Sequence, residues 1–207
     1  MEQSVALAIF AFVAFIFSVI IHEVSHVVVA ERLGDPTARN AGRITLNPLK
    51  HIDPMGSILL PAILLFIGSP VILGWAKPVP YDPRHLQNPK TAAGKIAAAG
   101  PVSNIIIAVL FAVLIRFGAG LGLSFELVKA FGTIVILNIA LAVFNLVPIP
   151  PLDGSKVLFS LLPANRTAHS LMAFLERYGI ILIFALLFYA GNLLFPVITW
   201  IFNLLVL

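Results

Sequence analysis

The residues best suited to chemistry lie in the pentapeptide HEVSH, which contains His22, Glu23 and His26 and directly follows a long apolar run. In a helix of about 3.6 residues per turn, the two histidines lie one above the other on one face, with the glutamate beside them. Two such imidazoles can bind one metal ion, and a neighbouring carboxylate can act as a general base. Ionisable groups this deep in an apolar segment are costly and usually functional. The spacing therefore predicts a metal site with a base next to it.

Two histidines leave a catalytic metal site incomplete, because such sites normally have three protein ligands and one open position. The acids and histidines that closely follow HEVSH lack the spacing of the third ligand in soluble HExxH enzymes. A more distant candidate is Asp153, in the segment NLVPIPPLDG that closes a later apolar helix. Its prolines prevent a continuous helix, and irregular backbone at membrane depth is tolerated only where it is buried in protein or lines a water-filled cavity. We expect Asp153 to complete the site in such a cavity.

The composition excludes an ordinary water-soluble domain. Of 207 residues, 60% are hydrophobic and 11% are charged, and the mean hydropathy is +1.05, whereas soluble domains have about 45–50% apolar and about 25% charged residues. The chain has no cysteine, which excludes disulfides and thiolate ligands. The formal net charge is +4, but the basic residues are scattered singly through polar loops, which favours cytoplasmic loops and argues against a nucleic-acid partner.

The apolar blocks predict an all-α polytopic membrane protein, a bundle of about four to six transmembrane segments in a single domain over residues 1–207. The expected helices are 5–33, 92–117, 125–147 and a short amphipathic one over 155–162. A polar link should follow to about residue 178. The tail, 179–207, is either one long crossing kinked at Pro196 or two shorter passes broken around Gly191.

An insert over residues 35–91 contains polar loops and an apolar stretch, 57–75, that either crosses the membrane or forms a re-entrant hairpin. If it is a hairpin, only Arg116 and Lys129 of the 13 basic residues lie on the opposite side from the others. The positive-inside rule therefore favours the hairpin, with the N-terminus outside the cell membrane and the main polar loops in the cytoplasm.

Three motifs together resemble the site-2 protease family of intramembrane zinc metalloproteases, an M50-like peptidase family. They are HEVSH in the first helix, GPVSN at 100–104 opening the next clear helix, with Gly100 and Pro101 as a helix start, and NLVPIPPLDG at 145–154 closing a later one. The resemblance extends from the first helix to Leu162, apart from the insert. We expect a short form of the family, without PDZ or CBS domains. One departure is Ser25, where family members often have glycine.

The resemblance implies roles for five residues. His22, His26 and Asp153 would bind one Zn²⁺ ion, Glu23 would be the general base, and Asn145 would help to hold the substrate or the developing oxyanion. The implied reaction is hydrolysis of a peptide bond in or near a transmembrane segment of another membrane protein. The Pro-rich stretch 148–152 could pair with an unwound substrate segment by β-addition.

The alternative is a non-proteolytic membrane metal-binding protein, either a transporter or an inactive scaffold. A transporter should carry further ionisable residues along a path and often has inverted repeats, and the sequence has neither. A scaffold would be expected to have lost Glu23 or a ligand, and these residues are all present. The sequence favours the peptidase.

Other polar residues have simpler interpretations. Asn104 should reach the site from a neighbouring helix, and Asn138 should make an interhelical hydrogen bond. His51 is either a ligand or gate residue or, as we favour, a loop histidine near the interface. His85 and His169 lie in predicted loops, where we expect them to be solvated.

Overall fold

The computed structural model describes residues 2–59, 62, 63, 66, 77, 80–118, 120 and 122–207, and the regular structure of this part of the chain is helical. The long helices are α1 (Glu2–Arg32), α4 (Pro89–Arg116), α5 (Phe125–Asn145) and α7 (Arg166–Val206). The shorter elements are α2 (Thr37–Asn40), α6 (Asp153–Leu161), 3₁₀ turns at Pro48–Lys50 and Pro83–His85, and a π-helical segment at Pro54–Leu59.

Four of the described helices, α1, α4, α5 and α7, are long and apolar enough to cross a membrane. This confirms the predicted all-α, multi-pass membrane protein. Large hydrophobic side chains such as Phe12 of α1 and Phe188 of α7 are exposed. In a bilayer such side chains contact lipid, so their exposure needs no protein partner.

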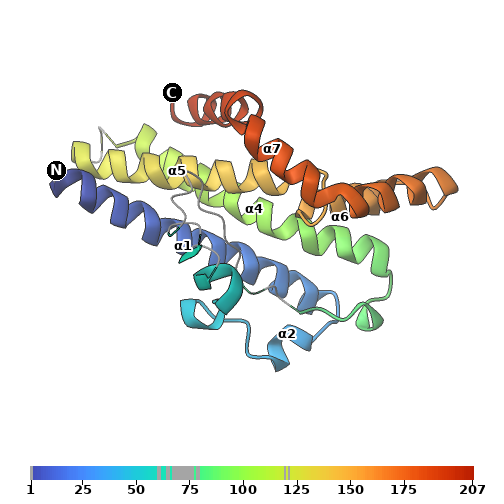
Figure 1. The fold of residues 1–207 in the computed structure, drawn as a ribbon. Coiled ribbons are helices and arrows are strands. Elements are labelled where there is room, and N and C mark those ends of the chain that lie inside the picture. The colour runs from blue at the N-terminus through green and yellow to red at the C-terminus, as the bar shows by residue number, and fades with distance from the viewer. Residues whose placement is uncertain are drawn as a thin grey trace.

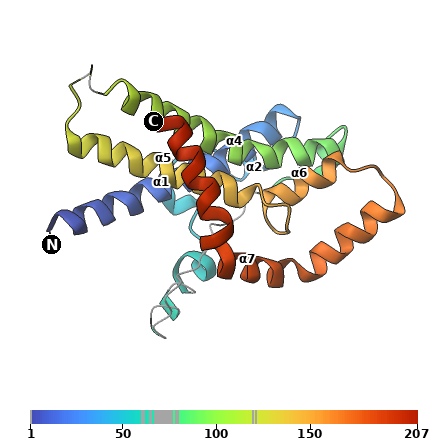
Figure 2. The same cartoon turned by 90° about the horizontal axis from the view of Figure 1, so that it is seen from above.

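Helix α4 is the central element, because it contacts α1, α5, α6 and α7. Figures 1 and 2 show α1, α4 and α5 running side by side, with α7 crossing the bundle. Where α4 meets α5, Ala108 and Ala112 pack against Val135 and Ile139, and all four side chains are buried. Small residues let membrane helices approach closely, and this contact holds α4 in place beside α1.

The C-terminal tail differs from its prediction. The polar link expected up to residue 178 is wrong, because α7 begins at Arg166, where the Asn165 side chain accepts a hydrogen bond from the Ala168 amide and caps the helix. Helix α7 then continues through Gly191 and Pro196 without a break. Its 41 residues would extend about 60 Å if straight, roughly twice the thickness of a bilayer core. Figure 2 shows that α7 instead bends sharply between its orange and dark-red stretches.

The insert 35–91 is described only in part. Its first half contains α2 and the Pro48–Lys50 turn, and its last residues form the Pro83–His85 turn that leads into α4. Most of the stretch 57–75, for which a re-entrant hairpin was predicted, lies outside the described residues. The hairpin and the division into one domain with an insert stay predictions.

Candidate metal centre

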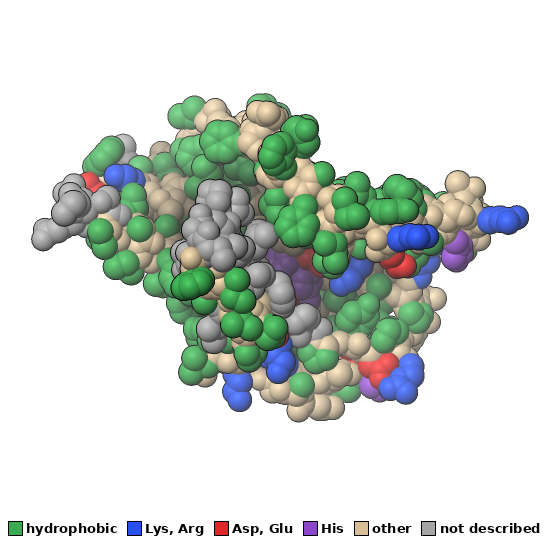
Figure 3. All heavy atoms as spheres, viewed as in Figure 1, with side chains coloured by type: hydrophobic (Ala, Val, Ile, Leu, Met, Phe, Trp, Pro, Cys, Tyr) green, Lys and Arg blue, Asp and Glu red, His purple; other side chains and the backbone are tan. Residues whose placement is uncertain are grey.

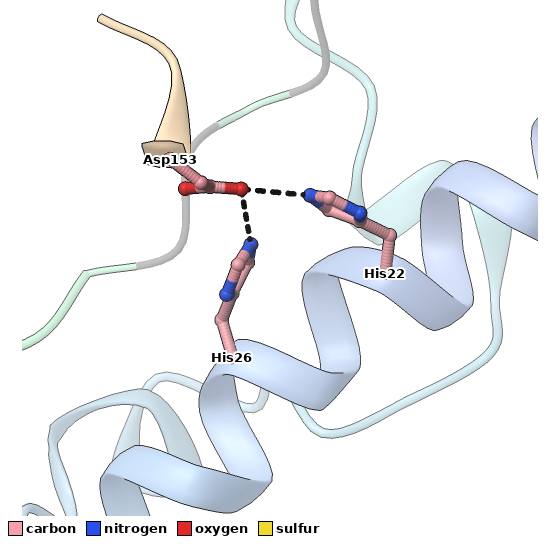
Figure 4. Close-up of side chains that lie close together, drawn as sticks. All are labelled: His22, His26 and Asp153. Atoms are coloured by element: carbon pink, nitrogen blue, oxygen red, sulfur yellow. Dashed lines mark hydrogen bonds and ion pairs between the residues drawn. The ribbon is translucent and has the colours of Figure 1, made fainter. Parts of the chain in front are cut away.

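Three side chains converge between α1 and α6. His22 and His26 lie one turn apart on α1, and Asp153 is the first residue of α6 (Figure 4). The Nε2 atoms of the two histidines are 3.1 and 3.2 Å from the same Asp153 Oδ2 atom. The exposed fraction of the side chain is 7% for His22, 11% for His26 and 12% for Asp153. The structure thus brings together the three residues that the sequence put forward as ligands.

The other ring nitrogen of each histidine contacts α4. Nδ1 of His26 lies 2.6 Å from the backbone oxygen of Ile96, and Nδ1 of His22 lies 2.6 Å from Oδ1 of Asn104. A carbonyl oxygen can only accept, so Nδ1 of His26 carries a hydrogen, and Nε2, which faces Asp153, is the nitrogen available to a metal ion. Metal-binding histidines commonly donate their second ring N–H in this way.

Close packing at two glycines shapes the centre. A Cβ atom on Gly100 of α4 would lie 2.5 Å from Cε1 and Nε2 of His22 and 2.6 Å from Cε1 of His26. A Cβ atom on Gly154 of α6 would lie 2.2 Å from the backbone oxygen of Leu146, at the end of α5. Any side chain at these positions would displace the rings or the start of α6. Gly100 and Gly154 therefore let the metal-binding side chains lie as close together as they do.

The donor atoms fit a metal ion. Ligand atoms that lie about 2.0–2.1 Å from a tetrahedral zinc ion are roughly 3.3 Å from one another, close to the 3.1 and 3.2 Å between each Nε2 and the carboxylate oxygen. One possible ligand atom from each of the three residues lies within 4.8 Å of the others. Imidazole nitrogens and a carboxylate oxygen are the ligands that zinc takes in catalytic sites.

The two predicted catalytic residues lie on α1 and at the end of α5. Glu23 is half-buried beside His22 on α1, and its carboxyl makes no hydrogen bond within the described part of the chain. Asn145 is the half-buried last residue of α5, and its Nδ2 donates to the Leu141 oxygen of its own helix. Neither side chain is tied to another element, so each can interact with a substrate.

The centre is not sealed from the surface. In Figure 3 histidine and acidic side chains are visible inside a recess of a face that is otherwise largely hydrophobic. The backbone between Asn145 and Asp153 forms turns rather than helix, with Pro148, Pro150 and Pro151 among them, as the sequence predicted. Irregular backbone next to a recess is the arrangement expected where water reaches membrane depth.

Comparison with known proteins agrees with this site. The family model described as Peptidase family M50 matches residues 123–190. The chain is 38% identical over 182 residues to "Putative zinc metalloprotease YwhC" of Bacillus subtilis. The matched region covers 85% of this chain and 78% of that protein. The chain belongs to peptidase family M50. This M50 peptidase is also 30% identical over 204 residues to "Putative zinc metalloprotease Rip2" of Mycolicibacterium smegmatis, covering 96% of the chain and 75% of that protein. No solved structure matches it.

The remaining polar residues of the M50 peptidase were predicted with mixed success. Asn104 contacts the site and Asn138 bonds across helices, as expected. His51 is buried in its loop with Nε2 2.8 Å from the Thr45 oxygen, and it lies outside the His-His-Asp group. His85 is exposed, as expected, and its Nδ1 also lies 3.1 Å from Asp35 Oδ1. His169 is exposed as well, but it lies in α7 and not in the predicted loop.

Apart from Asn104, sequence reasoning missed the contribution of α4 to the centre. The Ile96 oxygen that orients His26 is a backbone atom, so no side chain at that position signals its role. Gly100 carried a signal, since it stands in the GPVSN motif, but we had interpreted Gly100 and Pro101 as a helix start. They lie in the interior of α4 instead.

Proposed function

We propose that this M50 peptidase is an intramembrane zinc endopeptidase that hydrolyses a peptide bond in or near a transmembrane segment of another membrane protein. The observation that carries the proposal is the buried group of His22, His26 and Asp153 among helices that can cross a bilayer. Its donor set suits zinc, and the relatives named above are called zinc metalloproteases.

Each residue of the site has a role in this proposal. His22 and His26 would hold the ion through Nε2 and Asp153 would hold it through its carboxylate, the atoms that lie closest together in this group. Bound zinc supplies Lewis-acid activation of water and of the substrate carbonyl. The Glu23 carboxylate accepts the proton that water gives up and passes it to the leaving amine. The Asn145 amide donates a hydrogen bond to the developing oxyanion.

The position of the site along α1 bears on where the substrate is cut. His22 is ten residues before the end of α1 at Arg32, or about 15 Å at 1.5 Å per residue. It therefore lies in the half of the helix next to the polar insert. With the N-terminus outside, as the basic residues favour, this half is the cytoplasmic one, and cleavage occurs near the cytoplasmic side.

A helical substrate must unwind before it is cut, because each helical carbonyl is hydrogen-bonded and shielded by its neighbours. The turn backbone at 148–152 leaves peptide groups outside the helical bonding pattern. We infer that this stretch pairs with the unwound substrate by main-chain hydrogen bonds. Substrates should then share a helix-breaking residue near the scissile bond rather than one side-chain type.

The decisive experiment is the substitution Glu23→Gln, assayed on a model transmembrane substrate in proteoliposomes. We expect cleavage to be lost while bound zinc, measured by elemental analysis, stays at the wild-type level. The matched control is Glu31→Gln, because Glu31 is on the same helix and pairs with Arg39 away from the centre; it should leave cleavage intact. Wild-type cleavage by the Glu23→Gln variant would refute the role of the base.

The ligand assignment is tested separately with Asp153→Ala, which should lower the zinc content because the remaining histidines bind the ion weakly. A wild-type zinc content in this variant would remove Asp153 from the ligand set. The orientation can be tested with single cysteines, since the chain has none. In intact cells a membrane-impermeant maleimide should label Lys129→Cys and leave Arg39→Cys unlabelled; the reverse pattern would overturn the orientation.

A further inference from the structure

A chain of buried polar side chains connects the centre to two other helices. It contains Ser18 and His22 of α1, Asn104 of α4 and Asn138 of α5, which are 4%, 5%, 0% and 0% exposed. The Asn104 Nδ2 donates to Asn138 Oδ1 at 2.8 Å, and the Asn138 Nδ2 donates to Ser18 Oγ at 2.9 Å. Two asparagines buried completely in an apolar bundle are expensive unless their hydrogen bonds are made. Their arrangement therefore calls for a reason beyond packing.

A backbone carbonyl decides which way the Asn138 amide points. The Asn138 Nδ2 also lies 2.9 Å from the backbone oxygen of Ile134, and a carbonyl oxygen accepts and never donates, so this position must be occupied by an NH₂ group. The Asn104 Nδ2 lies 3.4 Å from the backbone oxygen of Ser18, a long contact that holds Asn104 only weakly without Asn138. Turning either amide over would place two acceptor oxygens face to face. Both asparagines are thus held in one orientation.

This orientation fixes the proton of His22. Because the Asn138 amide presents Oδ1 to Asn104, the Asn104 amide must answer with Nδ2, which leaves its Oδ1 facing His22. An amide oxygen only accepts. The His22 Nδ1, 2.6 Å away, must therefore carry a hydrogen, which leaves Nε2, on the Asp153 side of the ring, as the nitrogen available to a metal ion.

We propose that Asn138, acting through Asn104, is a positioning residue that locks His22 in the tautomer able to bind the metal through Nε2. The proposal rests on the proposed function, in which His22 is a ligand. His26 needs no such relay, since the Ile96 carbonyl fixes its tautomer directly. The Nδ1 of His22 instead faces the side-chain amide of Asn104, and an amide can turn over and exchange its oxygen and nitrogen. The hydrogen bond from Asn104 to Asn138 prevents that rotation.

The first test measures the tautomer itself. The chain is labelled with ¹⁵N-histidine and carries Asp153→Ala, which removes the carboxylate that faces Nε2, and spectra of the metal-free protein in detergent are recorded at rising pH until they stop changing. With Asn138 in place, His22 should show a protonated Nδ1 and a bare Nε2. In Asn138→Leu the Asn104 amide is free to turn, and His22 should show a mixture of both tautomers. A His22 that keeps the same pattern in Asn138→Leu would overturn the relay.

The second test separates positioning from structural damage. Asp has two equivalent acceptor oxygens, so an Asn104→Asp side chain can accept from His22 Nδ1 whichever way it is turned. In the wild-type background, Asn138→Leu should weaken zinc binding about 10–100-fold, the usual effect of losing an outer partner of a metal-bound histidine. In the Asn104→Asp background an Asp oxygen faces Asn138 Oδ1, so the same substitution removes that repulsion and should not weaken zinc binding. An equal loss in both backgrounds would mean that Asn138 only supports the fold.

A matched control lies on the same helix. Thr133 of α5 is half-buried, and within the described part of the chain its hydroxyl bonds to the Lys129 oxygen of its own helix and to no other element. Thr133→Val should therefore leave both the His22 tautomer and the zinc affinity unchanged, and a loss like that of Asn138→Leu would overturn the proposal. Failure of the proposed function gives a different result, since the tautomer would then shift in Asn138→Leu with no change in zinc affinity.

Discussion

A single methyl group at Gly100 should disable the metal centre. The Cβ atom of Gly100→Ala would lie 2.5 Å from Cε1 and Nε2 of His22 and 2.6 Å from Cε1 of His26. Ordinary contacts between such atoms are about 3.5–4.0 Å, so one or both rings must move by about 1 Å. The rings cannot move freely, because each Nδ1 is held at 2.6 Å by a hydrogen-bond partner.

The displacement is large for a metal site and small for the fold. Ligand distances tolerate errors of about 0.2 Å, and misplacing reacting groups by 1 Å can lower a rate about 10²-fold. Overpacking costs about 1–3 kcal/mol, while alanine in a helix is favoured over glycine by about 1 kcal/mol. We therefore expect a net loss of stability of at most about 2 kcal/mol, together with about a hundredfold loss of cleavage.

The assay compares three properties of the purified variant: zinc affinity by competition with a chelator, cleavage of a transmembrane substrate, and thermal unfolding. The matched control is Gly132→Ala in α5, where the nearest atom to a new Cβ is Phe202 Cζ at 4.0 Å. This control receives the same methyl group without the clash and should retain zinc and activity. If Gly100→Ala binds zinc and cleaves within threefold of the wild type, the rings do not rest on Gly100 and the reasoning is refuted.

Three further predictions concern Gly154, the bound metal and Asp35. Gly154→Ala places a Cβ atom 2.2 Å from the Leu146 oxygen, a backbone atom that cannot swing away, so both the zinc content and the melting temperature should fall. Chelation of the metal should lower the melting temperature of the wild type, because a ligand bound only by the folded state stabilises it; an unchanged value would contradict a bound ion. Burial raises the pKa of the Asp35 carboxyl, but hydrogen bonds from Thr37 and the Asp82 amide outweigh it and hold the pKa below its usual value. The carboxylate therefore stabilises the fold above about pH 4 and loses this effect as the pH falls through the folded-state pKa. The Asp35→Asn variant should have a lower melting temperature than the wild type at neutral pH, and its melting temperature should depend less on pH below pH 4.

The sequence was sufficient to predict the membrane helices and the three candidate ligands that the structure brings together. HEVSH places His22 and His26 on one helical face whatever the rest of the fold, and Asp153 was the acid next to irregular backbone at a helix end. The start of α7 was missed because its first turns are polar, and polarity alone does not distinguish an exposed helix from a loop. The capping side chain of Asn165 was the available signal.

The orientation of the ligands was beyond sequence reasoning for a different reason. A lone asparagine in an apolar helix predicts a hydrogen bond, and Asn138 makes one, but the residue type does not name the partner. The partner depends on how α1, α4 and α5 pack, which is set by small side chains such as Ala108 and by the apolar contacts around it. Local patterns encode which groups can bind a metal, and packing decides which atom of each group does so.

Helix α4 contributes no side chain to the metal, yet it determines the form in which α1 can bind one. Its Ile96 oxygen and Asn104 side chain occupy the Nδ1 atoms of both histidines, and Gly100 leaves the space in which the rings meet Asp153. Because α4 also contacts both α1 and α6, one helix sets the distance between the histidines and the carboxylate as well as their protonation. Loss of activity in an M50 chain can therefore arise with every ligand and the base intact, and intact ligands alone do not establish a working site.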